Sequence, residues 1–275
     1  TQVYASDFLP AAHQGTRVIP GDHPIANLQT PPSAKGLQNL ELNLTRALNQ
    51  RHLAARPHDS ALAARIKSFE TAFQMQTAAP EAFDLAQEPA HIRRLYGLDR
   101  KVKGPGADFA WQCLVARRLA ERGVRFIELI DTGSRPNWDS HGEMKEHADL
   151  AYNVDQPTAA LITDLKQRGM LDETIILWAT EFGRTPWREG KNGRGHHRDC
   201  FSVWVAGGGF KPGHVHGRTD DIGKYTEENP VEVHDLHATL LHQLGMDHER
   251  LTHRHAGRDF RLTDVHGHVV RDLLV

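Results

Sequence analysis

Cysteine, aromatic residues and long apolar runs are all scarce in this sequence of 275 residues. Its two cysteines, Cys113 and Cys200, are too few for a framework of several disulfides or for a Cys-x-x-Cys metal knuckle. No apolar run approaches the roughly 20 residues of a membrane-spanning helix, so a membrane span is not expected. The formal net charge is −2, which argues against an extended basic surface for nucleic acid.

Several signatures of catalysis are also missing. The sequence has no GxSxG elbow, no phosphate-binding P-loop and no GxGxxG after a strand pattern. Residues Cys113 to Arg117 are similar to the Cys-x-Pro-x-Arg signature of sulfatases, but they lack the proline and lie inside a helical pattern. We therefore interpret Cys113 as a core residue.

Histidine, by contrast, is abundant. The sequence has 19 histidines, most of them from His141 onward. Histidine is the commonest metal ligand in proteins and the usual acid–base group near neutral pH. We expect most of these histidines to be ordinary exposed residues and two or three of them to carry a function.

The beginning of the chain gives few structural signals. It opens at Thr1 without a basic or an apolar leader segment, so no signal peptide is predicted. Residues 1–35 are rich in proline, glycine and small polar residues and are predicted to be an irregular arm. Because an α/β domain normally opens with a strand, we expect the first strand to be missing from this chain.

Residues 36–275 are predicted to form a single α/β domain, in which 36–100 are a mostly helical insertion. Leucines at positions 37, 40, 44 and 48 have helical spacing and predict a helix up to residue 56. Asp59 or Ser60 is suited to cap a second helix, over 60–79. Two short helices are expected after Pro80 and Pro89.

Residues 107–275 are predicted to be the sheet-bearing core with a metal site. Helical patterns cover 107–123, 144–169 and 233–245, and strand patterns cover 124–130, 174–180 and 201–208. This alternation is typical of a mostly parallel sheet with helices on its faces. Ligands of such sheets bind beyond the carboxyl ends of the strands.

The loops that follow the predicted strands carry carboxylates, imidazoles and guanidinium groups. Carboxylate and imidazole together suit Zn²⁺, Mn²⁺, Fe²⁺ or a related ion, which could polarise an ester oxygen and activate water. Guanidinium groups match the oxygens of sulfate and phosphate. The residues concerned are Asp139 and His141 in NWDSHGE, Glu181 and Arg184 in WATEFGRTP, and Arg194, His196 and His197 in GRGHH.

Each of these residues also has a purely structural interpretation. Asp139 is suited to cap the following helix, helped by Glu143. Glu181 and Arg184 fit an ion pair that closes a turn. His197 fits an exposed neighbour of a functional histidine.

Longer stretches carry a family resemblance over essentially the whole chain. WATEFGRTP, GRGHHRDCFSVWVAGGGFKPG, NPVEVHDLHATLLHQLG and the upstream GVRFIELIDTGSRPNWDSHGEMKEH resemble the sulfatase-like proteins of domain-of-unknown-function family 1501. That family is placed in the alkaline phosphatase-like superfamily. The resemblance implies an α/β/α sandwich, a periplasmic or secreted location, and a hydrolase site with one or two divalent metals.

The resemblance also implies roles for individual residues. The metal ion would be Zn, Ca, Mg or Mn, and the nucleophile would be a Ser, Thr or modified Cys in a segment upstream of this chain, which is similar to the C-terminal part of a family member. The sequence departs from the superfamily pattern at Glu181, where relatives carry Asp, and at Phe182, where they carry a second ligand. The implied metal ligands are Asp139, His141, Glu181 and His196, the catalytic residues Arg184 and Glu181, the oxyanion-binding residues Arg184 and Arg194, and the additional residue His197.

Two classes of function follow from these observations. The first is a metal-dependent hydrolase of small-molecule or glycan sulfate or phosphate esters, with a phosphoryl or sulfuryl transferase as a variant. The second is a non-catalytic secreted or envelope-associated binding protein that keeps the fold with a degenerate site, because fold does not imply function. The sequence predicts no nucleic-acid partner and gives no oligomeric state.

Overall fold

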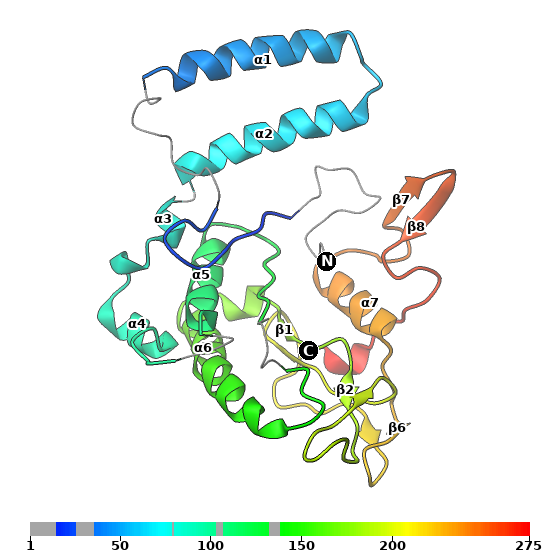
Figure 1. The fold of residues 1–275 in the computed structure, drawn as a ribbon. Helices are drawn as coiled ribbons and strands as arrows, with labels where there is room; N and C mark the ends of the chain where they lie inside the picture. Colours follow the sequence, from blue (N-terminus) through cyan, green and yellow to red (C-terminus); the bar gives the residue numbers. More distant parts are fainter. Residues whose placement is uncertain (1–14, 26–35, 79, 103–106, 132–137) are drawn as a thin grey trace. The chain divides into compact units, whose positions relative to one another are not determined.

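The structure, a computed structural model, describes residues 15–25, 36–78, 80–102, 107–131 and 138–275 (Figure 1). Most of the irregular arm predicted for residues 1–35 lies outside these ranges. The chain divides into two compact units. The first comprises residues 1–88 with 121–123, and the second comprises residues 89–120 with 124–275.

The first unit is helical in its described residues. It contains α1 (Gln38–Ala54), α2 (Ser60–Ala78), α3 (Pro80–Phe83) and the 3₁₀ turn η3 (Leu85–Gln87). The helices predicted over 36–56 and 60–79 are therefore confirmed. Asp59 caps α2, because its carboxylate accepts a hydrogen bond from the backbone N–H of Leu62 at 2.9 Å. The leucines of α1 that suggested the helix do not enter a core, since no residue of α1 is buried.

The second unit contains four longer helices and a buried core. They are α4 (Ala90–Tyr96), α5 (Phe109–Glu121), α6 (His147–Gln167) and α7 (Val233–Gln243), with 3₁₀ turns η4 (Met144–Glu146), η5 (Leu171–Glu173) and η6 (Arg271–Leu273). Each was predicted apart from the 3₁₀ turns, and α5 ends where the chain enters the first unit. Leu114, Leu161 and Leu165 are buried in this core. Cys113 is buried beside them, as predicted, and burial raises the pKa of its thiol.

Three of these helices meet at a buried ion pair. Arg117 of α5 places its Nε 3.0 Å from the Asp164 Oδ2 of α6, and both side chains are 2% exposed. The hydroxyl of Tyr96, on α4, donates to the same carboxylate at 3.1 Å. Arg168 adds a second guanidinium at 2.7 Å. A buried charge is tolerated only when it is paired and hydrogen-bonded in this way.

The strands are short and pair only locally. In the described residues they are β1 (Ile176–Trp178), β2 (Gly183–Arg184), β3 (His196–His197), β4 (Trp204–Ala206), β5 (Arg218–Thr219), β6 (Thr226–Glu228), β7 (Thr252–His255) and β8 (Arg258–Arg261). They form the two-stranded antiparallel sheets β1–β4, β2–β3, β5–β6 and β7–β8. β1 was predicted to be buried, but Leu177 and Trp178 are 38% and 39% exposed.

The combination of helices and strands was predicted correctly, whereas the mostly parallel sheet is not found among the described residues. Residues 124–130, predicted to be its first strand, are assigned to no strand, and Phe126 within them is 83% exposed. Parallel neighbours need a crossover, usually a helix. The helix α6 leads to β1, but the described residues between α5 and α6 contain no strand for it to connect. Between β1 and β4 the chain forms the β2–β3 hairpin and no helix, so β4 runs back along β1.

Candidate metal centre

Three side chains from two segments of the second unit converge on one point. Asp139 and His141 come from the segment that precedes η4, and His196 comes from β3. The Nε2 of His196 lies 2.7 Å from Oδ1 of Asp139, and the Nε2 of His141 lies 3.1 Å from the same oxygen. The two Nε2 atoms are 3.0 Å apart. The three potential ligand atoms therefore form a nearly equilateral triangle.

The size of this triangle fits the first coordination shell of a metal ion. Zinc binds nitrogen and oxygen at about 2.0–2.2 Å, so two ligand atoms on a tetrahedral zinc lie about 3.3 Å apart. Adjacent ligands of an octahedral ion at about 2.1 Å lie roughly 3.0 Å apart. One carboxylate with two imidazoles suits Zn²⁺, Mn²⁺ or Fe²⁺, whereas Mg²⁺ and Ca²⁺ favour all-oxygen sites. The donor set therefore favours a transition-series ion or zinc.

The β2–β3 hairpin presents His196 to the centre. The two strands are antiparallel, with Arg184 opposite His196. Thr185 closes the hairpin, because its N–H donates to the Gly195 carbonyl at 3.0 Å and its hydroxyl accepts from the Gly195 N–H at 3.1 Å. Successive side chains of a strand point to opposite faces. The two adjacent histidines therefore separate, with His196 exposed and His197 only 6% exposed.

The segment that carries His141 is clamped against the loop between these strands. The N–H of Asn192 donates to the Gly142 carbonyl at 3.0 Å, and the N–H of Met144 donates to the Asn192 carbonyl at 3.3 Å. A Cβ atom on Gly193 would lie 1.7 Å from the carbonyl oxygen of His141. Only glycine permits this close approach of the two backbones. The clamp thus brings His141 within reach of His196, 55 positions later in the chain.

Glu189 sets the tautomer of His141. Its Oε1 lies 3.0 Å from the His141 Nδ1. A carboxylate only accepts hydrogen bonds, so Nδ1 carries the proton and the Nε2 of the neutral ring keeps its lone pair toward the triangle. The hydrogen bond to Glu189 also raises the pKa of His141. Room for this carboxylate depends on Gly195, where a Cβ atom would lie 2.1 Å from Glu189 Oε2.

Glu189 was not predicted from the sequence. The signal available was that it is the only acidic residue between Glu181 and Asp199, in a loop already noted for glycine, arginine and histidine. Sequence spacing could not show that this loop folds back onto His141.

When both rings are neutral, only one hydrogen-bonding proton is available among the three converging atoms. His196 can donate one Nε2 proton to Asp139, but the Nε2 of neutral His141 then faces the same carboxylate without a proton between them. Either a second proton on His141 or a cation at the centre of the triangle relieves this contact. A divalent cation at the centre of the triangle would take the place of those protons.

Arg184 braces Asp139 from the other side. Its Nη2 donates to Asp139 Oδ1 at 2.8 Å and to the Trp138 carbonyl at 3.0 Å, and its Nη1 donates to the Arg194 carbonyl at 3.3 Å. The hydrogen bonds from His196 and then Arg184 hold the pKa of Asp139 well below its usual range. The Asp139 carboxylate is therefore anionic near neutral pH.

These contacts decide between the structural and functional interpretations of two residues. Glu143, and not Asp139, caps the turn that follows, because its carboxylate accepts from the Lys145 N–H at 3.1 Å. The carboxylate that pairs with Arg184 is that of Asp139, so the turn-closing pair with Glu181 is not the contact that the structure forms.

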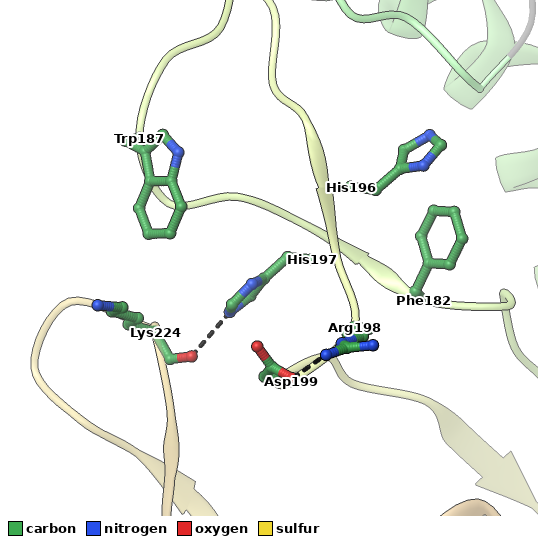
Figure 2. Close-up of a pocket in the computed structure, with 7 residues that line it drawn as sticks. All are labelled: Phe182, Trp187, His196, His197, Arg198, Asp199 and Lys224. Atoms are coloured by element: carbon green, nitrogen blue, oxygen red, sulfur yellow. Dashed lines mark hydrogen bonds and ion pairs between the residues drawn. The ribbon is translucent and has the colours of Figure 1, made fainter.

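Three residues singled out from the sequence lie away from the triangle. Glu181 is exposed, and its carboxylate is not one of the converging groups in the described residues. Arg194 donates through Nη1 to the Thr185 carbonyl at 2.7 Å, within its own loop. His197 is buried, and its Nε2 donates to the Lys224 carbonyl at 2.7 Å (Figure 2).

Comparison of the sequence with models of protein families identifies the family of this chain. A family model described as "Protein of unknown function (DUF1501)" matches residues 1–274. The chain belongs to this family. Neither the curated proteins nor the solved structures gave a match to this member of DUF1501. In the parts of the DUF1501 chain that the structure describes, no helix has both the length and the apolar composition that a membrane crossing requires.

Proposed function

We propose that this chain holds a divalent metal ion and acts as a metal-dependent hydrolase of sulfate or phosphate esters. The observation that supports this most directly is the convergence of Asp139, His141 and His196 with edges of 2.7–3.1 Å. A bound ion would polarise an ester oxygen and lower the pKa of a bound water. All three residues are exposed or half-exposed, which leaves the open positions that a catalytic metal needs.

Arg184 is proposed to bind the oxygens of the ester group. A guanidinium has five N–H donors, of which three are used by Asp139, Trp138 and the Arg194 carbonyl. One N–H on Nη1 and the N–H on Nε remain for a tetrahedral oxyanion next to the metal ligands. In this role Arg184 both holds Asp139 in place and stabilises the charge that develops on the ester.

The other residues named from the sequence have smaller proposed roles. Glu181 lies outside the converging group and is exposed, so its proposed part as a further metal ligand or base depends on a movement of the segment before Phe182 toward the triangle. Arg194 is proposed to hold the hairpin and to add positive charge at its rim. His197 is proposed to support the loop through its bond to Lys224.

A second function is favoured by one observation, the position of Phe182. The resemblance to the alkaline phosphatase-like superfamily implies a second metal ligand at this position, and the Phe182 ring packs against His196. An apolar ring there lowers the number of ligands that the centre can offer. A DUF1501 protein with this substitution could use the centre to bind a metal or an anion without turnover.

Turnover of 4-nitrophenyl sulfate and 4-nitrophenyl phosphate separates the two functions. The protein would be dialysed free of metal and then assayed with Zn²⁺ or Mn²⁺. We expect metal-dependent release of 4-nitrophenol that His141→Ala abolishes and His214→Ala, at an exposed histidine outside the triangle, does not. Metal binding without release of 4-nitrophenol would reject the hydrolase and favour the binding protein. Release that survives in His141→Ala would reject the centre itself.

A further inference from the structure

A cavity adjoins the metal centre on the side of His196. Its volume is about 430 Å³, and its lining residues come from the β2–β3 hairpin and from the turn between β5 and β6. Pockets for small molecules and cofactors range from roughly 300 to 1,000 Å³. His196 belongs to both the triangle and the cavity wall, whereas His197 lies on the other side of β3, so a substrate whose ester group reaches the metal would extend past the edge of β3 to fill this cavity (Figure 2).

The walls of the cavity are aromatic. Figure 2 shows Trp187 and Lys224 on one side of the cavity, Phe182 and His196 on the other, and His197 between them. Trp187 is 50% exposed, although an indole is usually at least partly covered by its own fold. Its edge contact with His197, at 5.8 Å between ring centroids, fixes its orientation. An exposed and fixed indole offers a flat surface to a ligand ring.

The two sides of the cavity are held together by a buried histidine. His197 is 6% exposed, and its Nε2 donates to the Lys224 carbonyl at 2.7 Å. The Lys224 N–H in turn donates to Asp220 Oδ1 at 2.7 Å. The backbone of the β5–β6 turn is therefore tied to the β2–β3 hairpin, so the cavity has a fixed frame and does not depend on two independent loops.

The charges in the cavity favour an anionic ligand. Arg198 has a carboxylate partner, since its Nε lies 3.5 Å from Asp199 Oδ1. The Lys224 ammonium lies 4.8 Å from the centroid of the Tyr225 ring, and the described residues place no carboxylate in an ion pair with it. Lys224 is therefore the cation that a ligand can neutralise, and Arg198 and Asp199 supply a donor and an acceptor for hydroxyl groups.

We propose that this cavity binds the sugar ring of an anionic carbohydrate ester, with the ring face against Trp187 and an acidic substituent against Lys224. This inference rests on the proposed hydrolase and names its substrate class. A sugar ring combines a C–H face, which packs on an indole, with hydroxyls that need charged donors and acceptors. A plain aryl group would fit the aromatic walls but would give the Lys224 ammonium no anionic partner.

The test is calorimetric titration of glucose 6-sulfate and glucose 6-phosphate into zinc-loaded protein. We expect Trp187→Ala and Lys224→Met each to weaken binding by about threefold to tenfold, as the loss of one aromatic or one ion contact predicts. Trp178→Ala is the matched control, because Trp178 is 39% exposed and pairs with Trp204 away from the cavity. Lys224→Met keeps the backbone bond to His197, so it tests the ammonium without opening the frame.

Zinc titrations run in parallel separate this inference from the proposed function. Zinc binding that is equal in the unsubstituted protein and in Trp187→Ala, with weaker sugar-ester binding in the variant only, supports the sugar site. Sugar-ester affinity that neither substitution changes, or no binding by the zinc-loaded protein, overturns it while leaving the metal centre intact. Losses that are larger for 4-nitrophenyl sulfate than for glucose 6-sulfate also overturn it, in favour of an aryl site. Absence of zinc binding in the unsubstituted protein rejects the proposed function itself.

Discussion

Two clusters in the second unit are each built around one aspartate and differ in how complete they are. Asp164 is 1% exposed and is surrounded only by donors: two guanidinium groups and the hydroxyl of Tyr96. Burial, followed by the charge of Asp164, raises the pKa of Tyr96, so the tyrosine remains a neutral donor. This cluster satisfies its carboxylate from within the protein, and it joins three helices.

The cluster around Asp139 is exposed, and its imidazole nitrogens are not all satisfied by hydrogen bonds within the cluster. Its side chain is 55% exposed, and two imidazole nitrogens that are 3.0 Å apart face the same oxygen. One Nε2–H would satisfy this oxygen, so the second imidazole nitrogen beside it is more than a structural carboxylate needs. The buried cluster therefore joins helices of the fold, whereas the exposed cluster is the one that we propose takes a cation from outside.

The largest expected effect would break the buried cluster. Asp164→Ala removes the carboxylate that pairs with the buried Arg117 guanidinium, and loss of one partner of a buried pair costs about 3–5 kcal/mol. Urea unfolding monitored by circular dichroism should show this loss. The matched change Asp139→Ala should leave the unfolding midpoint nearly unchanged, because exposed ion pairs contribute little. A similar loss in both variants would show that the two clusters do not differ as described.

A smaller effect is expected from Gly193→Ala, which tests the clamp between the two segments of the exposed cluster. The added methyl would lie 1.7 Å from the His141 carbonyl oxygen, so one segment must move. Overpacking of this kind costs about 1–3 kcal/mol, and zinc affinity should fall with it. Gly36→Ala is the control, because a Cβ atom there meets nothing within 4 Å. Unchanged zinc affinity in Gly193→Ala would mean that the clamp does not position His141.

Glu189→Gln is expected to weaken zinc binding by about 10–100-fold, as loss of an outer-shell partner of a metal-binding histidine does. The reason is the tautomer of His141, which the carboxylate selects through Nδ1. Zinc titration measures the affinity, and ¹⁵N chemical shifts of the imidazole measure the tautomer. A purely structural role for Glu189 would leave the ¹⁵N shifts of His141 unaltered.

The smallest effect on zinc affinity is expected for Glu181→Gln. Its carboxylate is exposed and outside the converging group, so affinity should change by less than about threefold. A loss of zinc affinity as large as that of His196→Ala would contradict this expectation, because it would make Glu181 a fourth ligand of the centre. Isothermal titration with Zn²⁺ distinguishes the two results.

The parts of this fold that local sequence determines were predictable, and the parts that depend on distant pairing were not. Apolar spacing located α1, α2, α5, α6 and α7, because a helix closes its hydrogen bonds within its own segment. The strand predicted over 124–130 was not found. A strand is stable only beside a hydrogen-bonded partner strand, and the sequence of 124–130 does not show which segment would pair with it. The same limit explains β1, which pairs with β4 in the opposite direction to that expected.

The candidate centre could likewise be predicted from the sequence only in part. The residue types in the loops predicted a mixed carboxylate and imidazole group, and the structure brings Asp139, His141 and His196 together. Residue spacing alone left His196 and His197 as alternatives, because the choice depends on which face of β3 meets the core, and it was the family resemblance that named His196. Nor could it find Glu189, because that contact exists only after the loop folds back at Gly193 and Gly195.

The most direct test of the account is a calorimetric titration of Zn²⁺ into the metal-free protein and into Asp139→Ala and His196→Ala. The account predicts one strong site in the unsubstituted protein and a loss of more than about 100-fold in each variant, beyond the effect of any outer-shell change. Circular dichroism should confirm that both variants keep their helices. Zinc binding of equal affinity in all three proteins, or no zinc binding in any, would contradict the assignment of this triangle as a metal centre.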